Sequence, residues 1–256
     1  MQASPRPFVL VPGACLGGWA WREVATQLRA LGHEVHEVTL TGLGERVHLA
    51  RPDTDVETHV TDVVNVLDFN TLEDVVLVGH SYAGTVVTGA ADRRPERLNA
   101  VVYLDTSPLP DGTAITDLQS PEQREHQRRA VQEVGEGWRW PVPDRDTLAS
   151  GMYGSAAGLS DEQLEAIIEL GTPQPYATMT SPIRLSHPQP PAVRRAAIFC
   201  TDGGIDVAAV RELVVKGDPR AAAFAGDDWE LHEIATGHWP MFSAPRELAD
   251  ALHLIA

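Results

Sequence analysis

Short runs of branched apolar residues alternate with amphipathic stretches at both ends of the chain. Continuous runs such as VVLV and AVVYL are typical of parallel strands that are buried on both faces, whereas the stretches between them have helical spacing. This alternation predicts an α/β fold with a mostly parallel sheet flanked by helices. The predicted strands are 8–11, 34–40, 75–78, 100–104, 196–200 and 229–234, and the predicted helices are 19–31, 56–69, 82–92, 207–215 and 245–255.

The pattern changes between residues 108 and 191. Prolines become more frequent, charged residues cluster in PEQREHQRRAVQE, and no strand-like run appears. We therefore expect a mostly helical insertion, carried by one α/β unit made of residues 1–107 and 192–256. Most of its larger apolar side chains should pack within the insertion and onto the sheet. A few should form the roof of a pocket, because such folds bind ligands at the carboxyl edge of the sheet; the candidates are Trp138, Trp140, Met152, Tyr153, Tyr176 and Met179.

Length and charge narrow the class of ligand. A chain of 256 residues is within the range of one large α/β domain. Its 36 acidic and 20 basic residues give a formal charge of −16, which disfavours nucleic acid and anionic membranes as partners. A small uncharged or weakly acidic molecule is the expected ligand, and a homodimer is possible.

Targeting and cysteine signals are weak. The apolar run before Pro12 is too short for the core of a signal peptide, and no later segment is apolar enough to span a bilayer, so we expect a cytoplasmic protein. Each of the two cysteines, Cys15 and Cys200, ends an apolar run and resembles a small core residue. Neither belongs to a pair or cluster with metal-ligand spacing, so neither a disulfide nor a metal site is expected.

The stretch VLVGHSYAGTVV interrupts a buried strand with Gly-His-Ser and continues into a helix. In a nucleophile elbow, a serine takes a strained turn conformation, and small residues two positions before and after it let strand and helix pass closely. Gly79 and Ala83 meet this steric requirement around Ser81. The placement between strand and helix favours a nucleophile over an ordinary turn residue.

A serine nucleophile needs a histidine base and an acid that orients it, in the chain order Ser, acid, His. His238 lies in ATGHWPM, after a predicted strand and before the last helix, at the edge where the elbow emerges. We expect it to be the base. The side chain of His80 should point away from the serine, and five further histidines should be solvated: His33, His36, His59, His126 and His253.

The tetrahedral intermediate of acyl transfer also needs two preorganised N–H donors. The backbone of Tyr82, directly after the serine, is one candidate. The loop after the first strand, PGACLGG, supplies the other, and Ala14 is the expected donor; Pro12 has no N–H and can only shape the turn.

These residues resemble the α/β-hydrolase superfamily, and within it the plant methyl-ester esterases and hydroxynitrile lyases with their bacterial relatives. The similar stretches are FVLVPGACLGGWAW, VVLVGHSYAG, FCTDGGI and ATGHWPM. The resemblance implies an α/β-hydrolase fold, a serine esterase with a helical cap, no cofactor, and Ser81 and His238 in a catalytic triad. Pro12 stands where that group usually has histidine. The lyases carry threonine and lysine where this chain has Gly13 and Trp239, which weakens the lyase interpretation.

Two aspartates compete for the role of the acid. Resemblance to the plant esterases indicates Asp202, after the strand AAIFC, although a residue beside two glycines is also typical of a solvated turn. Asp105 follows the strand after the elbow helix, where the similar haloalkane dehalogenases carry their acid. A carboxylate at a buried strand end is costly without a partner, and this argument favours Asp105. Asp206 resembles a helix N-cap instead.

The predicted function is hydrolysis of an ester, thioester or lactone of a small, largely apolar substrate by a carboxylesterase-like enzyme. Two alternatives stay open. One is a lyase, cyclase or dehydratase of a biosynthetic pathway that uses the same triad. The other is a small-molecule binding protein with little turnover.

Overall fold

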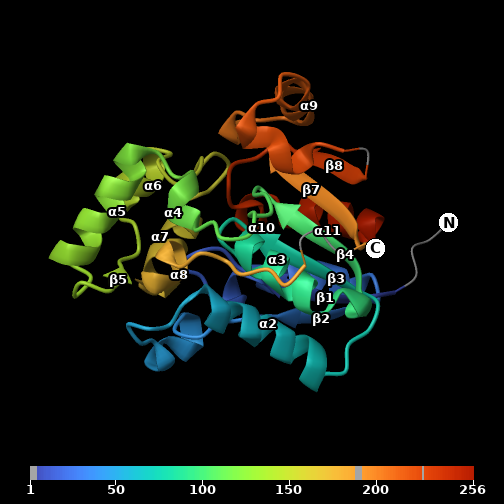
Figure 1. Cartoon of the computed structure of the whole chain (residues 1–256), viewed down its shortest axis with the longest axis horizontal. Helices are drawn as coiled ribbons and strands as arrows, with labels where there is room; N and C mark the ends of the chain where they lie inside the picture. Colours follow the sequence, from blue (N-terminus) through green and yellow to red (C-terminus); the bar gives the residue numbers. More distant parts are fainter. Residues whose placement is uncertain (1–4, 188–191, 227) are drawn as a thin grey trace.

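Six parallel strands form the central sheet in the order β2-β1-β3-β4-β7-β8 (Figure 1). The computed structural model describes residues 5–187, 192–226 and 228–256. The strands are β1 (Pro7–Val11), β2 (Glu34–Glu37), β3 (Val75–His80), β4 (Leu98–Leu104), β7 (Arg194–Cys200) and β8 (Trp229–Ile234). The predicted mostly parallel α/β sheet is therefore confirmed.

Apolar side chains on both faces of the strands explain the continuous apolar runs. In β1, Val9 and Val11 belong to one buried cluster, whereas Phe8 and Leu10 belong to the other. Side chains alternate between the faces of a strand, so each run supplies both layers of core. Helices α2 (Val56–Phe69), α3 (Ala83–Arg93) and α9 (Val207–Val215) contribute to the first cluster, and α1 (Arg22–Ala30) and α11 (Pro245–Ile255) contribute to the second.

The predicted elements differ from the observed ones mainly at their ends. The strand expected over 34–40 ends at Glu37. The helix expected over 19–31 is a 3-10 turn, Gly18–Trp21, followed by α1. Periodicity gives the presence of an element more reliably than its last hydrogen bond.

Between β4 and β7 the regular elements are mainly helices, and this part of the chain lies on one side of the sheet, at the left of Figure 1. We call its described residues, 108–187, the insertion; its expected end at residue 191 lies outside the described residues. It also holds two short antiparallel strands, which are too short to leave a pattern in the sequence. Its elements are α4 (Ile115–Leu118), α5 (Pro121–Glu133), β5 (Arg139–Trp140), α6 (Arg145–Ala149), α7 (Asp161–Leu170), β6 (Gln174–Pro175) and α8 (Ala177–Thr180).

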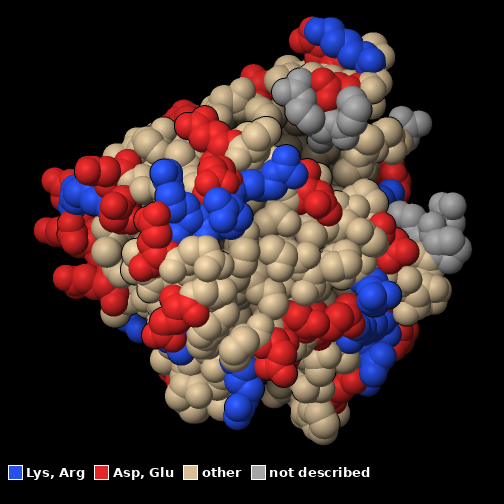
Figure 2. Space-filling model, turned by 60° about the vertical axis from the view of Figure 1, so that its left-hand side comes forward, with Lys and Arg blue, Asp and Glu red and all other residues tan. Residues whose placement is uncertain are grey.

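Charges of both signs are mixed on the face of the molecule on which the insertion points toward the viewer in Figure 2. Figure 2 shows Lys and Arg side chains beside Asp and Glu side chains, with uncharged areas between them. Among the described residues, no helix combines the length and apolar character needed to cross a bilayer.

Candidate active site

Ser81 occupies the corner between β3 and α3. Its φ of +52° is in the left-handed region, which is strained for a residue other than glycine. Its N–H donates to the carbonyl of Leu104 at 3.1 Å, and its own carbonyl accepts from Gly84 at 2.9 Å. The strand on one side and the first helical turn on the other thus hold the strained residue in place.

Close packing explains the small residues around this corner. A Cβ added at Gly79 would lie 2.6 Å from a side-chain carbon of Val87 and 2.7 Å from the carbonyl oxygen of Ala83. Strand and helix can therefore approach each other only because Gly79 has no side chain. This is the steric requirement expected of a nucleophile elbow.

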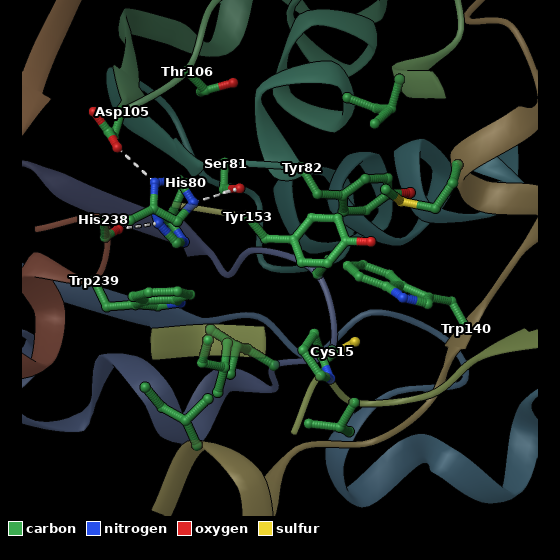
Figure 3. A pocket seen from close by; sticks show the side chains of 18 of the residues that line it. Cys15, His80, Ser81, Tyr82, Asp105, Thr106, Trp140, Tyr153, His238 and Trp239 are labelled. Carbon is green, nitrogen blue, oxygen red and sulfur yellow. Dashed lines mark hydrogen bonds and ion pairs between the residues drawn. The ribbon is translucent and has the colours of Figure 1, made fainter. Parts of the chain in front are cut away.

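A chain of hydrogen bonds joins Ser81, His238 and Asp105, which come from three separate loops (Figure 3). His238 Nε2 lies 2.9 Å from Ser81 Oγ, and His238 Nδ1 lies 2.5 Å from Asp105 Oδ2. Because an ionised carboxylate can only accept, Nδ1 carries the proton and Nε2 accepts from the serine hydroxyl. This arrangement can remove a proton from Ser81 Oγ.

Asp105 lies directly after β4, with a φ of +48°. Its Oδ1 accepts from the backbone N–H of Cys200 at 3.1 Å. Burial alone raises the pKa of this carboxyl, but the hydrogen bond from His238 and the Cys200 amide outweigh that effect and leave the pKa below its usual value. The carboxylate therefore stays ionised at neutral pH.

The structure does not bring Asp202 to His238. Asp202 is exposed, in a short 3-10 turn after β7, and its backbone N–H donates to the carbonyl of Thr236 at 3.0 Å. Asp206 caps α9 by accepting from the N–H of Ala209 at 2.7 Å, as its position in the sequence predicts. Of the three candidate acids, Asp105 alone contacts the imidazole of His238 within the described parts of the chain.

His80 supports His238 rather than Ser81. Its Nε2 donates to the backbone carbonyl of His238 at 2.7 Å, and the two rings lie 4.7 Å apart. Burial, together with the neighbouring His238, lowers the pKa of His80 to about 3. His80 is therefore a neutral donor that holds the loop of His238.

Both residues expected to donate backbone N–H groups to the oxyanion lie beside Ser81. Ala14 and Tyr82 line the cavity at Ser81, and among the described residues neither amide N–H has a hydrogen-bond acceptor. The next amide, that of Cys15, is already bonded to the side chain of Gln174 at 2.9 Å. Cys15 and Cys200 are buried, as predicted, and burial raises the pKa of the Cys15 thiol to about 12, so it stays protonated.

Two histidines expected in solvent are buried. His59 is 0% exposed; its Nδ1 accepts from the hydroxyl of Tyr82 and its Nε2 donates to the carbonyl of Thr41, both at 2.8 Å. His33, 4% exposed, contacts His253 at 2.8 Å. Polar residues near these two histidines in the sequence suggested exposure. Their burial could not be recognised there, because their hydrogen-bond partners come from other elements.

A cavity of about 200 Å³ opens at Ser81. Three residues of the predicted roof line it, namely Trp140, Tyr153 and Met179, and Trp239 lines it beside His238. In Figure 3, Tyr82, Tyr153 and Trp140 lie together on one side of Ser81, and Trp239 lies below His238. No Lys or Arg is among the described residues that line this cavity. An ionised group of a ligand would lack a cationic partner there.

A metal site is not evident in the described parts of the chain, where no three His, Cys, Asp or Glu side chains gather closely enough to hold an ion.

Comparisons with known proteins agree with the fold and the motifs. Residues 8–251 match the alpha/beta hydrolase family. This chain belongs to that family. The α/β-hydrolase resemblance is thereby confirmed, and relatives that are named esterases support the prediction of a carboxylesterase-like α/β hydrolase.

Individual relatives of this hydrolase align with nearly its whole length. A carbendazim-hydrolysing esterase from Nocardioides sp. (strain SG-4G) is 32% identical over 96% of this chain and 97% of its own length. Methyl jasmonate esterase 1 from Vitis vinifera is 26% identical, covering 100% of this chain and 98% of its own. An extracellular α/β-hydrolase from a Paenibacillus species has a similar fold, with a TM-score of 0.80 at 21% identity over 98% of this chain and 99% of its own.

Proposed function

We propose that this α/β hydrolase cleaves small, uncharged, largely apolar esters, and by the same chemistry thioesters or lactones, through a Ser81–His238–Asp105 triad. The observation that carries the proposal is the continuous hydrogen-bonded chain from Asp105 through His238 to Ser81, which ends in a cavity. The names of relatives, a carbendazim-hydrolysing esterase and a methyl jasmonate esterase, favour ester hydrolysis.

The geometry supports the following sequence of steps. Ser81 Oγ attacks the carbonyl carbon of the ester while His238 Nε2 takes the hydroxyl proton. Asp105 keeps the proton on Nδ1 and stabilises the imidazolium that forms. The N–H groups of Ala14 and Tyr82 donate to the oxyanion. His238 then protonates the leaving alcohol. In the second half of the reaction, water attacks the acyl group on Ser81 while His238 Nε2 takes a proton from it, and the proton returns to Ser81 Oγ as the acid leaves.

The dimensions of the cavity support a small substrate. A cavity of about 150 Å³ lined by apolar side chains is enough to bind benzene. The cavity at Ser81, about 200 Å³, therefore has room for one ring or a short acyl chain together with the ester group. We propose that the insertion acts as a cap that sets this limit through Trp140, Tyr153 and Met179.

The first experiment tests the nucleophile. Ser81→Ala should abolish hydrolysis of p-nitrophenyl acetate, and the unchanged protein, but not the variant, should be labelled by a fluorophosphonate. Unchanged hydrolysis by pure Ser81→Ala protein would contradict the proposal.

A second experiment tests the acid with a matched pair of substitutions. Asp105→Asn should lower kcat by roughly 10⁴-fold, because an amide facing Nδ1 favours the wrong tautomer of His238. Asp202→Asn should leave kcat within about twofold, because the exposed side chain of Asp202 has no contact with His238. Equal losses in both variants would remove the argument for Asp105.

A third experiment tests the preference for uncharged substrates. Methyl benzoate should be hydrolysed with a kcat/KM at least about tenfold higher than monomethyl terephthalate, which adds one ionised carboxylate. That carboxylate would lose its hydration without gaining a cationic partner from the described lining residues. Equal kcat/KM values would show that the charge stays in water, and the proposed substrate class would have to be widened.

A further inference from the structure

The loop that carries Ala14 contains a strained residue. Leu16 N–H donates to the carbonyl of Gly13 at 3.3 Å and closes a tight turn over residues 13–16. Within this turn Cys15 has a φ of +65°, in the left-handed region. Such a conformation is unfavourable for a residue with a side chain, so it persists only where neighbouring groups hold it.

The groups that hold Cys15 come from the insertion, more than 150 residues further along the chain. The Cys15 N–H donates to Gln174 Oε1 at 2.9 Å, and the Cys15 carbonyl accepts from the N–H of Thr172 at 2.9 Å. Both polar groups of one strained residue are therefore bonded by a single short segment of the insertion.

The amide of Gln174 is held in one orientation. Gln174 is 0% exposed, and its Nε2 donates to Thr178 Oγ1 at 2.8 Å. The Thr178 hydroxyl in turn donates to the carbonyl of Pro175 at 2.6 Å. Because Nε2 faces a hydroxyl that donates elsewhere, the acceptor Oε1 must face Cys15.

We propose that Gln174 is a positioning residue for the oxyanion site: by binding the Cys15 amide it fixes the 13–16 turn and leaves the Ala14 amide free to face the reacting carbonyl. This inference rests on the proposed function. Without an acceptor at Cys15, a buried N–H would be left unpaired and the left-handed conformation would lose a partner. The peptide would rotate toward a relaxed conformation, and the adjacent Ala14 N–H would leave its position.

The test is Gln174→Met, which keeps the volume and removes the acceptor. We expect kcat/KM for p-nitrophenyl acetate to fall by about 10- to 100-fold, less than the loss on deleting an oxyanion donor. The inhibition constant of an aryl trifluoromethyl ketone, which forms a tetrahedral adduct with the serine, should rise by the same factor. The matching methyl ketone, which binds as a ground-state analogue, should keep its inhibition constant within about threefold.

Gln127→Met is the matched control. Gln127 is also a fully buried glutamine of the insertion, on α5, but neither of its side-chain polar atoms has a partner among the described residues. The Gln127→Met substitution should leave kcat/KM and both inhibition constants unchanged. Gln174→Glu keeps an acceptor oxygen toward Cys15 and should recover most of the activity lost in Gln174→Met. If Gln174→Met does not fold, Gln174→Asn, whose shorter amide cannot reach Cys15, replaces it with the same expected losses.

The outcomes separate the two proposals. Active Ser81→Ala protein would refute the proposed function itself. The inference about Gln174 alone would be overturned by a different pair of results. In that case Ser81→Ala is inactive, but Gln174→Met binds the trifluoromethyl ketone as tightly as the unchanged protein does. Equal weakening of the two ketones would also overturn it, because that result indicates a damaged pocket rather than a displaced oxyanion donor.

Discussion

Gly154, in the loop between α6 and α7, packs closely against His238, the proposed base. A Cβ at this position would lie 2.4 Å from His238 Cγ and 2.5 Å from His238 Cβ. Carbon atoms in favourable contact are about 3.5–4.0 Å apart, so Gly154→Ala requires a shift of more than about 1 Å. The φ of +127° at Gly154 adds backbone strain for alanine.

The loop has little freedom to move away from the imidazole. His238 N–H donates to the carbonyl of Ser155 at 2.7 Å, and Gly237 N–H donates to the carbonyl of Ala157 at 3.1 Å. We therefore expect the imidazole to be displaced, which breaks its alignment with the hydroxyl of Ser81, now 2.9 Å away. A displacement of about 1 Å in a catalytic group can cost about 10²-fold in rate.

The assay is kcat/KM for p-nitrophenyl acetate, with the rate of fluorophosphonate labelling as a second measurement, and we expect both to fall by roughly 100-fold in Gly154→Ala. Gly151→Ala is the control, because Gly151 lies in the same loop with a φ of +75°, while its added Cβ would have no heavy-atom neighbour closer than 3.9 Å. It should lose about 1 kcal/mol of stability and keep kcat/KM within about twofold. Equal rates in Gly154→Ala and the unchanged protein, or equal losses in both variants, would refute the reasoning.

Further predictions concern stability and thiol reactivity. Because the pKa of His80 is lowered from 6.5 to about 3 on folding, the unfolded chain binds a proton there that the folded chain does not, and stability decreases as the pH falls through this window. Between pH 7.5 and 5.0, His80→Gln should therefore lose about 2 kcal/mol less unfolding free energy in urea than the unchanged protein. Equal losses in the two proteins would contradict a neutral, buried His80. Gly79→Ala should lose about 1–3 kcal/mol in the same measurement, because its methyl group would lie 2.6 Å from a carbon of α3; unaltered stability would contradict the close packing. Cys15 and Cys200, 4% and 1% exposed, should react with Ellman's reagent only after unfolding, and rapid labelling of the folded protein would show that they are accessible.

Local patterns were sufficient for the sheet and for the serine corner. The apolar runs of β3 and β4 supply both core layers, so their burial can be recognised without knowing their neighbours. The steric need for small residues at Gly79 and Ala83 arises between a strand and the helix that follows it directly. Such signals lie within a few residues of one another, and a single sequence displays them.

Contacts between distant segments could be read only from the tertiary structure. Asp105 and Asp202 both follow strands of the same sheet, and it is the packing of the loops that places Asp105 beside His238. His59 has polar neighbours in the sequence, yet it is buried because Tyr82 and Thr41 provide its partners. The sequence by itself determined which helices and strands form and at which corner a serine adopts a strained conformation. The partners of each polar side chain were decided by the fold. A hydrogen bond requires a donor–acceptor distance of about 2.7–3.2 Å, and no local pattern shows which distant segments the fold brings that close.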